Sequence, residues 1–249
     1  TAAFIVAGIS AYKVMKGDNS KATKSAMNVG VIVAAILIPV QIFIGDASGL
    51  LVLKHQPDKL AAIEAIWETE QPAALTLFAI PNNETRSNDF PIAIPHLGSL
   101  ILTHSWDGEI KGLNEFDVHP PVAPVFFSFR VMVGIGFLML FASCMGVFQL
   151  WRKKEISTWM HKLLFGMTFS GWIAVVAGWY VTEIGRQPWI VYGLLKTSDA
   201  VAPHGPTVMI TSLTMYIILY AFLLVSYLSV LFYMTNKTIK NNIAAAKGA

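Results

Sequence analysis

The sequence predicts an all-α integral membrane protein: a bundle of five transmembrane helices, the first of them truncated, with one long external loop. Composition is the first indication, because 55% of the 249 residues are hydrophobic and only 13% are charged, a balance typical of membrane proteins. The second is a set of four apolar runs, each long enough to cross a bilayer. The third is the placement of basic residues, which alternates along the chain as the positive-inside rule requires.

The four apolar runs cover residues 27–45, 124–151, 163–182 and 207–234. A helix needs about 20 residues to cross the hydrocarbon core, and each run reaches that length. A fifth run, residues 1–15, is apolar but shorter, and no polar flank precedes it. We expect this run to be the end of a spanning helix whose upstream part is missing. The alternative is an interfacial or half-crossing helix.

Basic residues predict the orientation of the helices. They gather after the short run 1–15, between the runs 124–151 and 163–182, and in the tail, so these parts are expected in the cytoplasm. The residues are Lys13, Lys16, Lys21, Lys24, Arg152, Lys153, Lys154, Lys162, Lys237, Lys240 and Lys247. The acidic segment 46–123 and the weakly charged segment 186–206 then lie outside. Because this topology accounts for the net charge of +3, no nucleic-acid partner is expected.

The expected organisation has three parts. Residues 1–46 form two transmembrane helices, residues 47–123 form the external loop, and residues 124–249 form three transmembrane helices and a cytoplasmic tail. The chain is therefore expected to be a multi-pass protein of a prokaryotic cytoplasmic membrane, with the loop outside and the C-terminus inside.

The external loop is expected to contain one short helix. Pro57 and Asp58 offer a helix start, and good helix formers follow them, so we expect a helix lying on the outer membrane surface. The polar stretches 82–89 and 103–114 are expected to be irregular. On the helix, a solvated face explains Lys59 and Glu64, whereas a binding role would require an external polar ligand docked there.

Two charged residues stand where the run 163–182 ends. Glu183 and Arg186 are three residues apart, so they share a face if the helix continues. They can form an ion pair that anchors the helix end, or Glu183 can ligate a metal or handle protons while Arg186 meets an anion. Ionisable groups at membrane depth are costly and are usually retained for a function. Trp179 and Trp189 fit an interfacial aromatic belt.

A third charge, Arg130, lies about two turns inside the run 124–151. It needs either a partner in the protein interior or a path for its side chain to the interface. Met132 follows two residues later, and by residue type alone it is a packing residue. The single Cys144 excludes a disulfide within the chain and is also expected to pack.

No histidine lies inside an apolar run, so a haem in the membrane would need histidine ligands from elsewhere. The six are His55, His96, His104, His119, His161 and His204. Three of them, His96, His104 and His119, lack the spacing of zinc ligands and are expected at the surface.

Three stretches together carry a resemblance to a known family. They read Lys59-Leu-Ala-Ala-Ile-Glu64-Ala-Ile-Trp67, Phe129-Arg130-Val-Met132, and Gly178-Trp179-x-x-x-Glu183-x-Gly-Arg186-Gln-Pro-Trp189. In this order they resemble subunit I of the cytochrome bd quinol oxidases. The resemblance covers essentially the whole chain, but only the C-terminal part of a typical subunit I, from its fifth to its ninth span.

The resemblance implies specific roles for the singled-out residues. Met132 would be an axial ligand of the low-spin haem b, whose histidine partner lies upstream of this chain. Glu183 would ligate the high-spin haem b, and Arg130 and Arg186 would lie near haem propionates. Trp179 would lie between haems on an electron path and, with Glu183, belong to the catalytic set.

The resemblance also implies a substrate and partners. The external segment would be the quinol-binding loop, of the short-loop type, with Lys59 and Glu64 as the substrate residues. The oxygen-reducing haem, haem d or a third haem b, would be held by the N-terminal part of subunit I, which this sequence lacks. Further partners are subunit II, the lipid bilayer and, as an optional member, a small single-span subunit.

The function implied is a terminal quinol oxidase, a quinol:oxygen oxidoreductase active only with its missing half and partner subunits. It would oxidise quinol at the outer face, reduce oxygen to water and contribute to the proton gradient. Two alternatives remain at this stage: a non-catalytic haem b electron-transfer relative, and a membrane transporter with buried charges. A transporter predicts paired, broken helices in two halves, and the sequence shows no such pairing.

Overall fold

The computed structural model describes residues 1–153, 155–201 and 205–247, and shows two compact units, Thr1–Ala200 and Val201–Ala249. Four helical segments are long and apolar enough to cross a membrane: Lys21–His55, Val122–Lys153, Thr158–Ile184 and Pro206–Tyr227. Each overlaps one of the four predicted runs, but the helix Lys21–His55 continues ten residues beyond the predicted end at residue 45, so residues 47–55 are helical and not loop.

The shorter helix α1 (Ala2–Met15) corresponds to the fifth predicted run. At 1.5 Å per residue its 14 residues extend about 21 Å, less than the roughly 30 Å hydrocarbon core. A fifth crossing stays a prediction.

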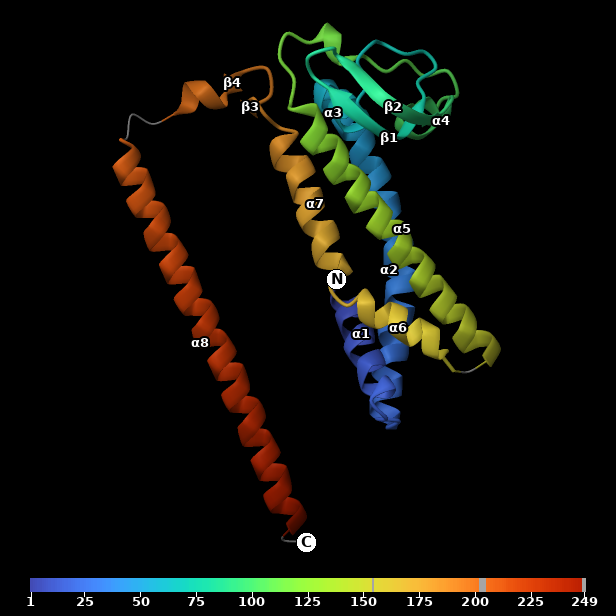
Figure 1. The fold of residues 1–249 in the computed structure, drawn as a ribbon, viewed down its shortest axis with the longest axis vertical. Coiled ribbons are helices and arrows are strands. Elements are labelled where there is room, and N and C mark those ends of the chain that lie inside the picture. Colours follow the sequence, from blue (N-terminus) through green and yellow to red (C-terminus); the bar gives the residue numbers. More distant parts are fainter. Residues whose placement is uncertain (154, 202–204, 248–249) are drawn as a thin grey trace. The chain divides into compact units, whose positions relative to one another are not determined.

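The first unit is built around two long helices, α2 (Lys21–His55) and α5 (Val122–Lys153), with α7 (Ser170–Ile184) beside α5 and α1 beside α2 (Figure 1). Helix α6 (Thr158–Gly166) packs on α1. Small residues allow these close approaches, as in other membrane bundles. A Cβ added at Gly30 would lie 2.7 Å from the Ala3 carbonyl oxygen of α1.

The predicted run 163–182 is interrupted. Three residues, Met167–Phe169, separate α6 from α7, where the sequence had suggested one continuous helix. The Thr168 hydroxyl donates to the Phe165 carbonyl at 2.6 Å. A Cβ at Gly8 of α1 would lie 2.1 Å from the Thr168 Oγ1, so the interruption is packed closely against α1.

Residues 56–121 lie at one end of this unit, which we call the loop end. They comprise α3 (Pro57–Glu64), strands β1 (Leu75–Asn82) and β2 (Ser87–Ile94), helix α4 (Leu97–Thr103) and the 3-10 turn η1 (Leu113–Glu115) (Figure 1). The expected short helix is confirmed as α3. The expectation of an irregular stretch at 82–89 is wrong, because its two ends belong to the antiparallel strands β1 and β2.

Two larger hydrophobic cores and a small cluster of Ile66, Ala73 and Ile110 stabilise the first unit. One joins α1, α2, α5 and α6 through residues such as Phe4, Val31 and Met160. The other lies at the loop end and joins α3, α5 and α7; its members include Ala61, Ala62, Ile63, Val122, Val125, Phe126 and Val181. The loop-end core is the one that positions the predicted site residues.

After α7 the chain forms a small hairpin of β3 (Trp189–Val191) and β4 (Leu195–Lys196), followed by the 3-10 turn η2 (Thr197–Ala200). The second unit contains helix α8 (Pro206–Lys247). Within its apolar segment Pro206–Tyr227, none of the most hydrophobic window is buried. Such an all-round apolar helix is suited to lipid or to other protein chains.

Candidate functional site

Arg130 of α5 reaches the loop and is held there by three acceptors. It donates from Nη1 to the Ile63 carbonyl at 2.6 Å and from Nη2 to the Glu64 Oε2 at 2.7 Å. Nη2 also donates to the Thr76 carbonyl. The guanidinium carbon stands 4.0 Å from the ring centre of Phe126, so an aromatic face covers the cation. Of the two sequence-based readings, an interior partner is the one observed.

Glu64 is only 1% exposed. Burial raises the pKa of its carboxyl, and the Arg130 guanidinium opposes that rise. A buried ion pair of this kind contributes little net stability, but removing one partner costs about 3–5 kcal/mol because a charge is left buried alone. The solvated helix face expected for Glu64 is therefore wrong.

Lys59 lies one and a half turns earlier on α3. It is also buried, and its side chain points to α7. Its Nζ lies 3.4 Å from the Thr182 carbonyl of α7. Its aliphatic carbons pack against Gly185, where an added Cβ would be 3.1 Å from the Lys59 Cε. Burial and the nearby Arg186 charge lower the pKa of Lys59. The solvated face is wrong here too.

Met132 lies between α5 and α7. A Cβ added at Gly178 of α7 would be 2.8 Å from the Met132 Sδ. The thioether is thus held in the position that the missing side chain of Gly178 leaves open. Trp179, the next residue, is 60% exposed.

Glu183 and Arg186 form an ion pair at the C-terminal end of α7, as one of the two sequence-based readings expected. Their side chains are 44% and 45% exposed. Both are therefore partly accessible to solvent, in contrast to the buried pair of Glu64 and Arg130.

Sequence reasoning missed a contact between α3 and the hairpin after α7. The phenol of Tyr192 interacts with the carboxylate of Asp58. Burial and the Asp58 charge raise the pKa of Tyr192 to about 12, while burial raises the pKa of Asp58. Asp58 had been noted only as a helix-start signal, and nothing in the sequence linked it to a residue so far along the chain.

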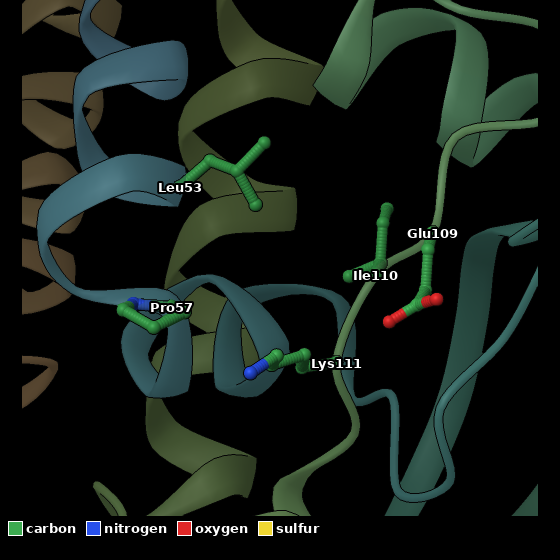
Figure 2. Close-up of a pocket in the computed structure, with 5 residues that line it drawn as sticks. All are labelled: Leu53, Pro57, Glu109, Ile110 and Lys111. Atoms are coloured by element: carbon green, nitrogen blue, oxygen red, sulfur yellow. The ribbon is translucent and has the colours of Figure 1, made fainter.

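Two shallow hollows border the loop end. One, of about 300 Å³, is lined by Leu53 of α2, Pro57 at the start of α3, and the segment Glu109–Lys111 (Figure 2). The other, of about 280 Å³, lies between residues 115–118 and the β3–β4 hairpin and includes Tyr192. Neither hollow is lined by Lys59, Glu64, Met132 or Glu183.

The donor set decides which metal group the described residues could hold. Among them, no three or more His, Cys, Asp or Glu side chains that could hold a metal ion gather in one place. Haem iron needs only one or two axial ligands because the porphyrin supplies the other four. Met132 and Glu183, one donor on each of two packed helices, fit that requirement.

Arg130 and Arg186 are also suited to a haem, because its propionates are carboxylates. Three of the five N–H donors of Arg130 are used by the loop, so two remain for a further carboxylate. Arg186 is half exposed and can also serve an added anion. Charge-assisted contacts of this type are the usual partners of carboxylates in low-dielectric surroundings.

Comparison with known proteins agrees with these observations. The family model described as cytochrome bd terminal oxidase subunit I matches residues 1–239. Cytochrome bd ubiquinol oxidase subunit 1 of Bacillus subtilis is 33% identical over 217 residues, covering 82% of this chain and 46% of that protein. Cytochrome bd-II ubiquinol oxidase subunit 1 of Escherichia coli is 27% identical, with 91% and 57% covered.

A solved structure, the bd oxidase from Geobacillus thermodenitrificans, superposes with a TM-score of 0.80 at 32% sequence identity. The match covers 95% of this chain and 55% of the other chain. This chain therefore spans about half the length of the relatives it matches.

Fold and site together define a multi-pass, mostly helical membrane protein with candidate axial ligands on two packed helices. The chain belongs to the cytochrome bd terminal oxidase subunit I family, an oxidoreductase family of the respiratory chain. The chain covers about half the length of each relative, which is consistent with the prediction from the motifs that it is the C-terminal part.

Proposed function

We propose that this chain is the C-terminal, haem-binding part of a terminal quinol oxidase that oxidises quinol at the outer membrane face and reduces O₂ to water. The observation that carries the proposal is the convergence of the three predicted motifs at the loop end. Lys59 and Glu64 of the loop contact the same two helices that present Met132 and Glu183. Family membership supplies the reaction class.

Met132 is proposed as the axial ligand of a low-spin haem b and Glu183 as that of a high-spin haem b. The bound haems supply one-electron steps between quinol and oxygen. The packed position of the Met132 thioether against Gly178 supports a fixed ligand orientation, and a thioether ligand favours the reduced iron. Glu183 would hold the iron through a carboxylate oxygen, and Arg186, which contacts Oε2 of the same carboxylate, would hold a propionate.

Trp179 is proposed to lie on the electron path between haems, and its exposed ring leaves space for a neighbouring group. Arg130 is proposed to hold a propionate with its remaining donors. The third haem, haem d or haem b, is assigned to the N-terminal part of subunit I. Subunit II, quinol, lipid and an optional single-span subunit complete the proposed assembly in the prokaryotic inner membrane.

The loop end is proposed to face outward, with the C-terminus in the cytoplasm. The clustering of basic residues at the opposite helix ends supports this orientation. Quinol protons released outside and protons consumed from inside then contribute to the proton gradient. The proposed domain limits are residues 1–46, 47–123 and 124–249.

The test is the optical spectrum of the purified complex, reduced minus oxidised, with and without carbon monoxide. Low-spin and high-spin haem bands together support the proposal, and the absence of haem bands overturns it. A low-spin haem alone would favour a non-catalytic electron-transfer relative. In Met132→Leu the low-spin band should be lost while the high-spin band stays; an unchanged spectrum rejects this ligand.

A further inference from the structure

Two polar side chains of one short helix reach two different spans. From α3, Lys59 contacts the Thr182 carbonyl of α7 at 3.4 Å, and Glu64 contacts Arg130 of α5 at 2.7 Å. Thr182 precedes Glu183, and Arg130 lies two residues before Met132. Each contact therefore ends beside a proposed haem ligand.

Both side chains are committed to these contacts. Lys59 is 8% exposed and Glu64 is 1% exposed, and neither lines either of the two hollows described above. A side chain that touches quinol directly must present a polar atom to a ligand cavity. The polar atoms of these two residues instead face the backbone of α7 and the guanidinium of α5.

The apolar side of α3 makes the same connection. Ala61, Ala62 and Ile63 share one buried cluster with Val125 and Phe126 of α5 and Val181 of α7. Ala61 and Ala62 are fully buried, and their small side chains allow a close approach between α3 and the spans. Polar and apolar contacts thus tie one eight-residue helix to both ligand-bearing helices.

We propose that Lys59 and Glu64 are positioning residues, and that α3 acts as a tie bar that fixes the outer ends of α5 and α7 relative to each other. This deepens the proposed function and rests on it. Glu64 sets the place of Arg130 and, through it, the first turns of α5 around Met132. Lys59 holds the last turn of α7 around Glu183. Quinol oxidation depends on both residues through the geometry of the haem sites, without direct contact.

The experiment combines two measurements on the complete purified complex. Hydrogen exchange of the α3 amides reports the tie bar itself, and a redox titration with mediators that bypass quinol reports the low-spin haem. In Glu64→Ala we expect exchange of residues 60–64 to rise at least about tenfold, because the charge-assisted contact and its buried partner are both disturbed. We also expect a shifted low-spin midpoint potential. The matched control is Glu84→Gln, on the exposed β1–β2 turn.

Glu64→Gln keeps an acceptor facing Arg130 and should give a smaller rise in exchange and partial rescue of the potential. It decides the question if Glu64→Ala fails to accumulate. In Lys59→Met, hydrogen exchange should rise at residues 185–187, directly after α7, and the high-spin haem band should change. The control is Lys54→Met at an exposed position, which should leave both the exchange and the band as in the wild type.

The opposite result is a raised KM for quinol with wild-type exchange, potentials and bands in the Glu64 and Lys59 variants. It would identify direct quinol contacts and overturn the tie bar. Failure of the proposed function is distinguishable, because the exchange readout needs no haem. A complex without haem bands whose α3 still loosens in Glu64→Ala would retain the tie bar and remove the haem assignments.

Discussion

The Sδ of Met132 occupies the space beside the Cα of Gly178, where a Cβ would come within 2.8 Å. The obstructing atom belongs to a flexible side chain, so Gly178→Ala should fold but displace the thioether. If Met132 is an axial ligand, the low-spin haem band should shift or weaken while the high-spin band is kept. Optical difference spectra measure this.

Gly134→Ala is the matched control, since Gly134 lies on the Met132 helix with no atom within 4 Å of the added Cβ. Both changes replace glycine by alanine in a helix and so gain the same helix propensity. Equal spectra for the two variants would count against Met132 as a ligand.

Arg130→Met should destabilise the loop end by about 3–5 kcal/mol, because Glu64 is left buried without its cation. The carboxyl should then bind a proton more readily than in the wild type, since burial raises its pKa and the guanidinium no longer opposes that rise. In an infrared pH titration the protonated-carboxyl band should persist to higher pH than in the wild type, and chemical denaturation should show the loss of stability.

The double variant Arg130→Met with Glu64→Leu should recover much of that loss, because an apolar pair of similar volume avoids the buried charge. A double variant as unstable as the single one would show that the hydrogen bonds to Ile63 and Thr76, and not the ion pair, dominate the contact.

Tyr192→Phe should change the alkaline stability of the chain. The folded phenol has a pKa of about 12, above its ordinary value of 10, so the unfolded chain loses this proton first as pH rises. The contribution of Tyr192 is therefore present below pH 10 and lost between about pH 10 and 12. Melting temperatures of wild type and variant should converge across that window.

Tyr12→Phe, in α1, removes a phenol hydroxyl away from Asp58 and is the control variant for that comparison. A Tyr192→Phe offset that is constant with pH would mean that the phenol does not hold its proton against Asp58.

Gly112→Ala should destabilise the loop strongly, by about 1–3 kcal/mol or more. An added Cβ would lie 2.3 Å from the backbone carbon of Glu68 and 2.4 Å from the Trp67 carbonyl oxygen, and backbone atoms cannot move aside as a side chain can. Limited proteolysis of residues 66–121 should accelerate. Gly49→Ala, which meets nothing within 4 Å, should be digested like the wild type.

Hydropathy predicted the spans because membrane helices must bury their backbone hydrogen bonds within one apolar segment. Helix α3 was predicted because Pro57 and Asp58 are local start signals. The strand β1 was missed because it buries Thr76, Ala79 and Pro81 and exposes Leu77, Phe78 and Ile80. Register shifts between β1 and β2 break the alternation of a regular strand.

The contacts of the site were beyond sequence reasoning for a different reason. Glu64 and Arg130 are 66 residues apart, and Lys59 and Thr182 are 123 apart. Charge and periodicity could mark Arg130 as a residue that needs a partner. They could not show which carboxylate of the loop is that partner. The packing of α3 against α5 and α7 selects Glu64 as the partner. The sequence had instead predicted that α3 lies on the membrane surface.

The β1–β2 turn indicates where the loop end can accommodate additional residues. Asn82 closes the turn locally by accepting from the backbone N–H groups of Glu84 and Thr85, whereas α3 is tied to two spans. Additional residues inserted near Glu84 would leave those ties intact, but an insertion within α3 would break their register. The Escherichia coli relative aligns over 295 positions, more than the 249 residues here, so the family accommodates longer forms. The turn is thus the natural site for fusing a reporter without disturbing the helices.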